Sequence, residues 1–300
     1  GIRDIGVTGV QTCALPISAA GNWFWGNTAN SFSKSLFGRR DADGFVLDGF
    51  RPFTSGSHIA DYLQVAWEDR DTNARSFAAI PANRDGIRIE NDWDGFGQRQ
   101  TGSGRVTYTG VRIHRNEVFD HKPDGGRPYQ TVTPFLQQST LLNVFIGSAQ
   151  GALITARDYT RETSRPWLHS GVEKHTDDPW VRRVYGELYT RVKAATLLAD
   201  EAAATLDRVW SRGRDLTPQE RGEAAVVIAG ANAHAGEVAL DVTSRIFEVM
   251  GARSATIANG YDRFWRNVRI HTLHNPAEYK TRNVGNWFLT GVHPEPSAFQ

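Results

Sequence analysis

The sequence predicts an α+β chain built as an antiparallel β-sandwich or barrel domain followed by a C-terminal four-helix bundle. Three observations support this fold class. Short β-rich runs bounded by Asp, Asn and Gly follow one another to about residue 119. The stretch 120–129 is polar and rich in Gly and Pro, which is typical of a domain boundary. Beyond it, apolar residues recur at helical spacing. We therefore expect a β-domain over residues 18–120, a linker over 121–130 and a helical bundle over 131–300.

The first seventeen residues stand apart from this plan. The run VTGVQTCALPI, from Val7 to Ile17, looks like the translation of a sequencing-library adapter, so we expect the native chain to begin near Ser18. The single cysteine, Cys13, lies in this run, which leaves the rest of the chain without a disulfide or a cysteine metal site. An adapter-encoded segment has not been selected to fold with its neighbours, and we expect residues 1–17 to pack poorly.

Composition limits the classes of function. The chain has 300 residues and a net charge of +1, so non-specific nucleic-acid binding is not expected. We see no apolar run long enough to cross a bilayer. The apolar and charged fractions are those of a globular protein.

The β-domain is predicted from five runs. In GFVLDGFRPF, residues 44–53, the alternation and the Asp48-Gly49 pair predict a hairpin turn. The other expected strands are 61–68, 75–81, 86–90 and 105–113. Short strands at this spacing indicate a sandwich or barrel rather than a parallel sheet with interleaved helices.

The bundle is predicted from four long helical segments. The first two cover residues 132–163 and 179–212. The third opens at Thr217 as N-cap, with Pro218 at the first helical position and Glu220 completing a capping box, and runs to Met250. The fourth covers residues 261–289 and is broken at Pro276.

The break at Pro276 concentrates polar residues at a helix–helix junction. Asn275 is expected to cap the second half, with Pro276 at its first position and Glu278 in the capping box. His274 then lies at the junction itself, close to His271. Two readings stay open from this pattern alone: a capped turn with a satisfied histidine, or a functional site.

Other candidate chemistry is weaker. His271 and His274 lack accompanying carboxylates at helical spacing, so no metal site is expected. Ser55 and Ser57 lie near His58, but a hydrogen-bonding role in a turn is favoured over a nucleophile. The segment 91–104 is either an ordinary loop or one that brings amides and an aromatic wall to a planar ligand.

The segment NDWDGFGQRQTGSGRVTYTGVRI, residues 91–113, closely resembles the middle β-domain of the acyl-CoA dehydrogenase superfamily. GFVLDGFRPFTSGSHIADYLQV, residues 44–65, resembles the preceding hairpin, whose Thr-Ser-Gly turn meets the flavin in that family. The resemblance implies a multi-domain fold of N-terminal helical domain, flavin-binding β-domain, and C-terminal bundle that serves in flavin binding and oligomerisation. Because the resemblance covers the chain only from Asn22 onward, we expect the N-terminal helical domain to be missing from this sequence.

Four further segments resemble the dibenzothiophene monooxygenase group of this superfamily: NWFWGN (22–27), ARDYTRETSRPW (156–167), FEVMGAR (247–253) and YDRFWRNVRIHTLHNPAEYKTRNVG (261–285). The resemblance implies a two-component enzyme of the cytoplasm. It would take reduced FMN from a flavin reductase, with FAD as the alternative, and use O2 to oxygenate a small organic molecule such as an organosulfur compound. It also implies a homotetramer, with no nucleic-acid or membrane partner.

At the junction, the resemblance gives His274 an acid–base role in catalysis. Acyl-CoA dehydrogenases of the commonest type carry a catalytic glutamate where Asn275 stands, and an amide cannot remove a proton. His271 and Asn275 are implied to bind the cofactor.

In the rest of the chain, Thr54 and Ser55 match the turn that hydrogen-bonds the flavin ring, and Trp93 matches the aromatic beside it. Asn27 matches an active-site asparagine, and Ser55 is also a candidate for catalysis. Arg165 and Arg161 match the region where an arginine meets the flavin phosphate; these two carry cofactor-binding roles.

Two rival functions remain open from the sequence. One is an FAD-dependent acyl-CoA dehydrogenase that places its base elsewhere. The other is a non-catalytic assembly protein. The sequence does not fix the substrate.

Overall fold

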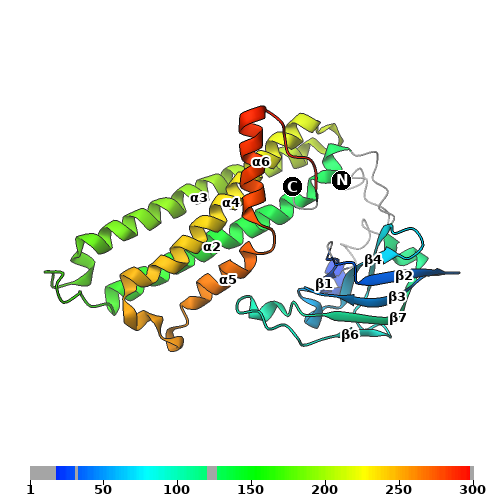
Figure 1. Ribbon diagram of the computed structural model, residues 1–300, viewed down its shortest axis with the longest axis horizontal. Helices are drawn as coiled ribbons and strands as arrows, with labels where there is room; N and C mark the ends of the chain where they lie inside the picture. The colour runs from blue at the N-terminus through cyan, green and yellow to red at the C-terminus, as the bar shows by residue number, and fades with distance from the viewer. Residues whose placement is uncertain (1–17, 31–32, 120–126, 298–300) are drawn as a thin grey trace. The chain divides into compact units, whose positions relative to one another are not determined.

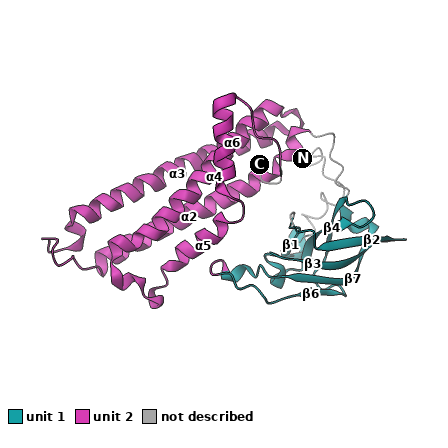
Figure 2. Ribbon diagram, viewed as in Figure 1, with its two compact units in different colours: residues 1–95, 99–123 teal, residues 96–98, 124–300 magenta. Residues whose placement is uncertain are grey.

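The computed structural model describes residues 18–30, 33–119 and 127–297 of the chain (Figure 1). The predicted adapter segment 1–17, with Cys13, lies outside the described residues. The chain divides into two compact units, one of residues 1–95 with 99–123 and the other of residues 96–98 with 124–300 (Figure 2). Unit 1 carries the strands and unit 2 carries the long helices.

Unit 1 is one eight-stranded sheet, ordered β6-β7-β3-β2-β4-β5-β8, with β1 pairing to β4 off this path. The strands are β1 (Trp25–Thr28), β2 (Leu36–Asp41), β3 (Gly44–Arg51), β4 (Tyr62–Asp69), β5 (Arg75–Pro81), β6 (Ile87–Ile89), β7 (Val106–His114) and β8 (Val118–Phe119). The prediction of a wholly antiparallel domain was too simple. β4 runs parallel to both β1 and β2, while the other described pairs are antiparallel.

The hairpin predicted at Asp48-Gly49 was wrong. β3 continues through both residues, and the β2–β3 turn lies instead between Asp41 and Gly44. Opposite β7, the register shifts between Leu47 and Gly49, which is a β-bulge. Gly49 has a φ of 131°, which residues with a side chain rarely adopt. The Asp48 carboxylate accepts a hydrogen bond from the Gly110 N–H (2.8 Å). The turn-forming pair is therefore used to bend a strand.

The interior of unit 1 is largely apolar but contains a buried ion pair. Arg51, at the end of β3, is 0% exposed, donates from Nε to the Ala66 carbonyl (2.8 Å) and pairs with Glu68 (2.9 Å). Desolvation lowers the pKa of Arg51, and the charge of Glu68 opposes this shift. Removing Glu68 would leave the buried charge of Arg51 unpaired, so the end of β3 is held firmly.

Unit 2 contains the long helices, which are α2 (Thr133–Glu162), α3 (Pro179–Arg212), α4 (Pro218–Met250), α5 (Asp262–Thr272) and α6 (Ala277–Thr290). α2, α3 and α4 run side by side, and α5 with α6 forms the broken fourth member (Figure 1). The predicted four-helix bundle is confirmed. Residues 96–98 group with this unit because the Gln98 N–H donates to Asn267 Oδ1 (2.8 Å) on α5.

Local capping explains the helix ends. Asp178 caps α3 by accepting from the Trp180 N–H, and Thr217 with Glu220 forms the predicted capping box of α4. α4 ends at Met250, followed by Gly251 at a φ of 83°. These ends were correctly predicted because the signals that set them are local.

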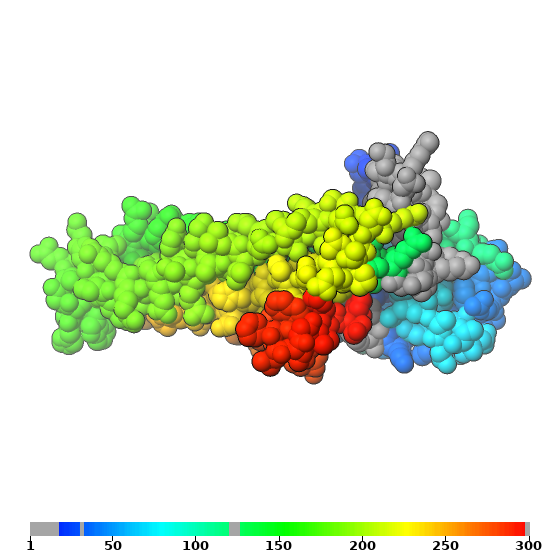
Figure 3. Space-filling view, turned by 90° about the horizontal axis from the view of Figure 1, so that it is seen from above, coloured from blue at the N-terminus to red at the C-terminus, as the bar shows by residue number. Residues whose placement is uncertain are grey.

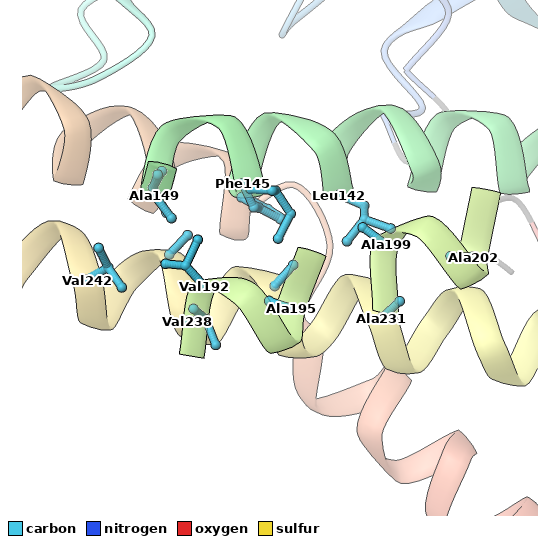
Figure 4. Packing of buried hydrophobic residues seen from close by; sticks show 14 of the residues in the cluster. Leu142, Phe145, Ala149, Val192, Ala195, Ala199, Ala202, Ala231, Val238 and Val242 are labelled. Carbon is cyan, nitrogen blue, oxygen red and sulfur yellow. The ribbon is translucent and has the colours of Figure 1, made fainter. Parts of the chain in front are cut away.

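Small residues allow the three long helices to approach closely. Figure 4 shows side chains of α2, α3 and α4 pointing into a shared core. The labelled residues are Leu142, Phe145 and Ala149 of α2, Val192, Ala195, Ala199 and Ala202 of α3, and Ala231, Val238 and Val242 of α4. The stretch 128–162 is long and apolar enough to cross a membrane, contrary to the expectation from sequence. Its buried residues belong to this core, as in a bundle helix.

The junction between α5 and α6 was predicted in position but not in detail. α5 ends at Thr272 and α6 begins at Ala277, so the break lies where Pro276 indicated. However, Pro276 itself occupies the cap position, in extended geometry (φ −61°, ψ 125°), and no side chain caps the helix. The predicted cap at Asn275 was wrong because α6 starts after the proline, not at it. Figure 3 shows α6, in red, on the outside of the bundle beside the yellow part of the chain.

Candidate functional site

In unit 1, a tight turn follows β3 and is fixed by hydrogen bonds. Thr54 is fully buried; its hydroxyl donates to the Gly104 carbonyl (2.8 Å) and lies 3.1 Å from Ser57 Oγ. The Thr54 N–H donates to the same carbonyl (3.1 Å). Gly56 has a φ of 78°, and its N–H donates to the Thr101 carbonyl (2.9 Å). The turn is therefore anchored to the strand-connecting loop that precedes β7.

The exposed side of this turn carries hydroxyl and amide groups. Ser55 Oγ lies 2.7 Å from Ser103 Oγ, which in turn lies 2.6 Å from Thr101 Oγ1. Ser55 is exposed, and its backbone N–H has no acceptor among the described residues. Ser57 is buried and hydrogen-bonded to Thr54, which agrees with the hydrogen-bonding role expected for it in the turn.

Two aromatic residues flank the turn. Phe53 is 63% exposed and has a φ of 57°, a left-handed conformation that costs a bulky residue energy. Its ring meets the Trp93 ring edge-on, at 6.3 Å between centroids. The exposed Phe53 ring and the half-buried Trp93 ring together offer apolar surface to a planar ligand. Phe53 was missed from the sequence because nothing in the letters F-T-S-G reveals a positive φ.

Asn27 lies beside the same turn. It is exposed near the end of β1, and its backbone N–H donates to the Ser55 carbonyl (3.1 Å). Its side-chain Oδ1 accepts from the Ala29 N–H (2.9 Å). The structure thus brings together the predicted residues Asn27, Thr54 and Ser55. Trp93 lies near them because its ring contacts the ring of Phe53, the residue before Thr54.

In unit 2, the α5–α6 junction holds two histidines. His271 lies in the last turn of α5, half-buried, with its ring edge-on to Phe145 (6.3 Å). Desolvation lowers the pKa of His271, and the charge of His274 lowers it further. His274 lies in the break and is exposed as a residue, yet desolvation still lowers its pKa, and the charge of Lys280 adds to the effect. Both imidazoles therefore favour the neutral form.

A cavity of about 700 Å³ adjoins this junction. Its walls come from α4, α5 and α6, with Phe145 from α2, and include the side chains of His271 and Asn275. Asn275 Nδ2 is buried and has no hydrogen-bond partner in the described part of the chain. A buried unsatisfied donor is costly, so this amide is suited to a ligand that carries an acceptor.

The remaining predicted residues lie at the far end of α2. Arg161 is in the last turn of the helix and Arg165 is in the loop that follows; both are exposed. Neither forms an ion pair with a described carboxylate, so both guanidinium groups are available to an anion. Trp167, 71% exposed, stands two residues beyond Arg165.

Lys280 is the functional candidate that sequence reasoning missed in unit 2. It lies in the first turns of α6, is 3% exposed, and burial lowers its pKa to about 8. One signal could have found it. Lys280 precedes Val284 by four residues and Trp287 by seven, so it shares the face of α6 that packs inward.

The family model for the acyl-CoA dehydrogenase C-terminal domain matches residues 140–278. A probable FMNH2-dependent monooxygenase, SfnC, from Pseudomonas putida is 37% identical over 94% of this chain and 72% of its own length. A dibenzothiophene monooxygenase from Mycolicibacterium goodii is 38% identical over 93% of this chain and 71% of its own length.

Among solved structures, FMN-bound TdsC from Paenibacillus sp. A11-2 has a TM-score of 0.90 at 35% identity, covering 99% of this chain and 78% of that one. The resemblance seen in the sequence and the predicted fold are confirmed by these matches. The chain belongs to the acyl-CoA dehydrogenase superfamily and, within it, to the flavin-dependent dibenzothiophene monooxygenase group.

Proposed function

We propose that this chain carries the flavin-binding β-domain and C-terminal bundle of a two-component monooxygenase that oxygenates a small organosulfur compound. A separate flavin reductase would supply the reduced FMN. Bound in its reduced state, the flavin supplies the electrons that activate O2. The observation that carries the proposal is the α5–α6 junction: a neutral, accessible imidazole at His274 stands next to an amide, not a carboxylate, at Asn275.

The donor set of unit 1 fits the ring end of a flavin. Flavin rings are planar, with carbonyl and nitrogen acceptors along one edge. The exposed Ser55 offers a hydroxyl and a backbone N–H to such acceptors. Phe53 and Trp93 offer apolar surface to the ring face. We assign Thr54 to shaping this turn, because its hydroxyl is buried and already bonded to Gly104.

Unit 2, taken by itself, carries donors suited to an anionic ligand. Arg161 and Arg165 present planar guanidinium groups, which bind phosphate through paired, charge-assisted hydrogen bonds. The buried Nδ2 of Asn275 and the half-buried ring of His271 are further polar groups for ligand binding. The relatives are named as FMNH2-dependent or solved with FMN, and this favours FMN over FAD as the flavin.

We assign the proton-transfer role in catalysis to His274. Its imidazole is neutral near pH 7, because its pKa lies below the ordinary value, and a neutral imidazole can accept a proton and return it. Asn275 cannot remove a proton next to a thioester, which disfavours dehydrogenation of an acyl-CoA at this position. Assembly as a homotetramer is part of the proposal, since the family resemblance implies it.

The test is oxygen transfer by the full chain. The protein is supplied with reduced FMN, a flavin reductase and ¹⁸O₂, and a panel of thiophenes, sulfides, sulfoxides and sulfinates is analysed by mass spectrometry. We expect one ¹⁸O atom per product molecule. Anaerobic bleaching of bound flavin by an acyl-CoA would instead identify a dehydrogenase. An absence of flavin binding would favour a non-catalytic assembly protein.

The junction is tested by His274→Ala and His274→Asn, with His169→Ala, an exposed histidine in the loop after α2, as the matched control. Both junction variants should lose oxygenation roughly a hundredfold or more, the usual share of an acid–base group, while binding FMN normally. The control should behave as wild type. Oxygenation by both junction variants within a few-fold of wild type would show that His274 does not carry the proton.

A further inference from the structure

Three hydroxyl groups of unit 1 form a row that ends at the exposed side of the turn after β3. Ser103 Oγ lies 2.7 Å from Ser55 Oγ and 2.6 Å from Thr101 Oγ1, so it stands between the other two. Ser103 is 7% exposed, whereas Ser55 is exposed. These three residues, the hydroxyl row, lead from the loop before β7 to the surface. Ser55 is the outer end, and a ligand at the turn would meet its hydroxyl first.

The backbone fixes the spacing of the hydroxyl row. Before the outer hydroxyl, the N–H and the side-chain hydroxyl of Thr54 both donate to the Gly104 carbonyl (3.1 and 2.8 Å). After it, the Gly56 N–H donates to the Thr101 carbonyl (2.9 Å). The turn and the loop are thus joined on both sides of the contact between the outer and middle hydroxyls. Because of this, the two oxygen atoms stay within hydrogen-bonding distance whichever of them donates.

The hydroxyl row can run in two directions, because each hydroxyl has one proton to donate and lone pairs that accept. If Thr101 donates to Ser103 and Ser103 donates to Ser55, the proton of Ser55 is left for a ligand. If Ser55 donates to Ser103 and Ser103 donates to Thr101, Ser55 turns a lone pair outward instead. Ser103 keeps both contacts in either direction, and hydrogen bonds in such a chain strengthen one another. The outer hydroxyl can therefore donate or accept while its oxygen keeps one position.

We propose that Ser103 is a positioning residue that holds the Ser55 hydroxyl toward the flavin ring in both redox states of the cofactor. A ring nitrogen that accepts a hydrogen bond in oxidised flavin carries a proton and donates one in reduced flavin. The two directions of the hydroxyl row match these two states. The inference rests on the proposed binding of FMN at Ser55, and it assigns Ser103 no contact with the cofactor.

A double-mutant cycle tests whether Ser103 acts through Ser55. The full chain is titrated with oxidised FMN, and binding is followed by the change in flavin fluorescence. Ser103→Ala should weaken binding about three- to tenfold, the usual contribution of one neutral hydrogen bond. In a Ser55→Ala background the same change should alter the affinity by less than about twofold, since the hydroxyl that Ser103 orients is gone. An equal loss in both backgrounds, or no loss in either, overturns the proposal.

Reduced FMN tests the reversal of the hydroxyl row. The midpoint potential of bound flavin, measured anaerobically, reports the ratio of the affinities for the oxidised and reduced states. Because the row serves both states, Ser103→Ala should weaken the binding of reduced FMN by a similar factor and leave the midpoint potential near that of wild type. A loss confined to one redox state would show that the row keeps a single direction, and it would overturn the proposed use in both states.

Two further variants complete the design. Thr101→Val removes the inner hydroxyl and keeps the side-chain shape; it should weaken FMN binding less than Ser103→Ala does, and a loss that persists in the Ser55→Ala background counts against the row. Thr72→Ala is the matched control, because this exposed hydroxyl lies in the turn after β4, where it accepts from the Ala74 N–H (3.2 Å), and its loss should leave FMN affinity unchanged.

Failure of the two proposals is distinguishable. If the wild-type chain binds no flavin, the proposed function and this inference fail together. If it binds FMN but the cycle shows no coupling between Ser103 and Ser55, only this inference fails.

Discussion

Replacing Lys280 with methionine should stabilise the protein, and the gain should depend on pH. Methionine is close to lysine in length and fills irregular space without a charge. Burial lowers the pKa of Lys280 from 10.5 to about 8. At 1.36 kcal/mol per pKa unit, the charged state of the folded protein is penalised by about 3 kcal/mol. Relaxation and water penetration reduce such penalties in real proteins, so we discount this to roughly 2 kcal/mol.

The sign of the pH dependence follows from proton binding. Between about pH 8 and 10.5 the unfolded chain holds more protons on Lys280 than the folded one does. Wild-type stability from this group therefore rises with pH across that window. The advantage of Lys280→Met should be complete at about pH 7 and roughly halved at about pH 9.5.

The assay is urea unfolding followed by helical circular dichroism at both pH values. Measuring at neutral pH and above keeps the histidine titrations out of the comparison. Lys280→Arg is the control, because guanidinium stays protonated and the stability of that variant should gain nothing from titration at position 280 between the two values. A methionine variant that is less stable than wild type, or one whose advantage is the same at both pH values, would refute the idea of a desolvated ammonium group at this site.

Three other predictions concern the candidate site. Arg165→Ala should weaken FMN binding about tenfold or more, because a charge-assisted hydrogen bond to phosphate contributes about that much. Its affinity for riboflavin, which has no phosphate, should stay unchanged. Equal losses of affinity for both ligands would rule out a phosphate contact. Thr54→Val should cost unit 1 roughly 1–3 kcal/mol in urea unfolding, because the turn loses a buried hydroxyl donor, while Thr140→Val on the exposed face of α2 should cost little. Wild type should lose stability as pH falls below about 6.5, since burial lowers the pKa of His271 and His274 and the unfolded chain takes up more protons. The His271→Gln, His274→Gln double variant should lose less over the same range, and an identical acid profile would contradict the assignment.

Much of the helical unit could be predicted because its signals are local. The bounds of α3 at Pro179 and Arg212 and the capping box at Thr217 depend on residues within one turn of each end. The break at Pro276 follows from the missing N–H and the fixed φ of proline. None of these needs knowledge of distant neighbours.

The features of the sheet that the sequence did not predict all depend on residues that are distant in the sequence. Asp48-Gly49 has strong turn propensity, but pairing with β7 and the bond from the Gly110 N–H hold it in a bulged strand. The parallel pairing of β1 with β4 joins segments separated by more than thirty residues, which no local pattern encodes.

In the candidate site, too, features set by local sequence could be predicted and features set by packing could not. The motif around Thr54 and Ser55 was visible in the sequence, and the structure brings both to one turn with Asn27. The strain at Phe53 and the burial of Lys280 were not visible. Both are properties of packing, which single letters do not specify.

The hydrogen bonds that anchor the Thr54–Ser57 turn bear on the entropy of ligand binding. Its backbone is tied to Gly104 and Thr101, and the strand before it ends at the buried Arg51. A flexible loop of this kind would have to be ordered each time a ligand arrived, at about 1–2 kcal/mol per residue fixed. Here that ordering is completed during folding, so the amide and hydroxyl of Ser55 meet a ligand already in place. Favourable contacts at this turn should consequently appear almost undiminished in the affinity for the ligand.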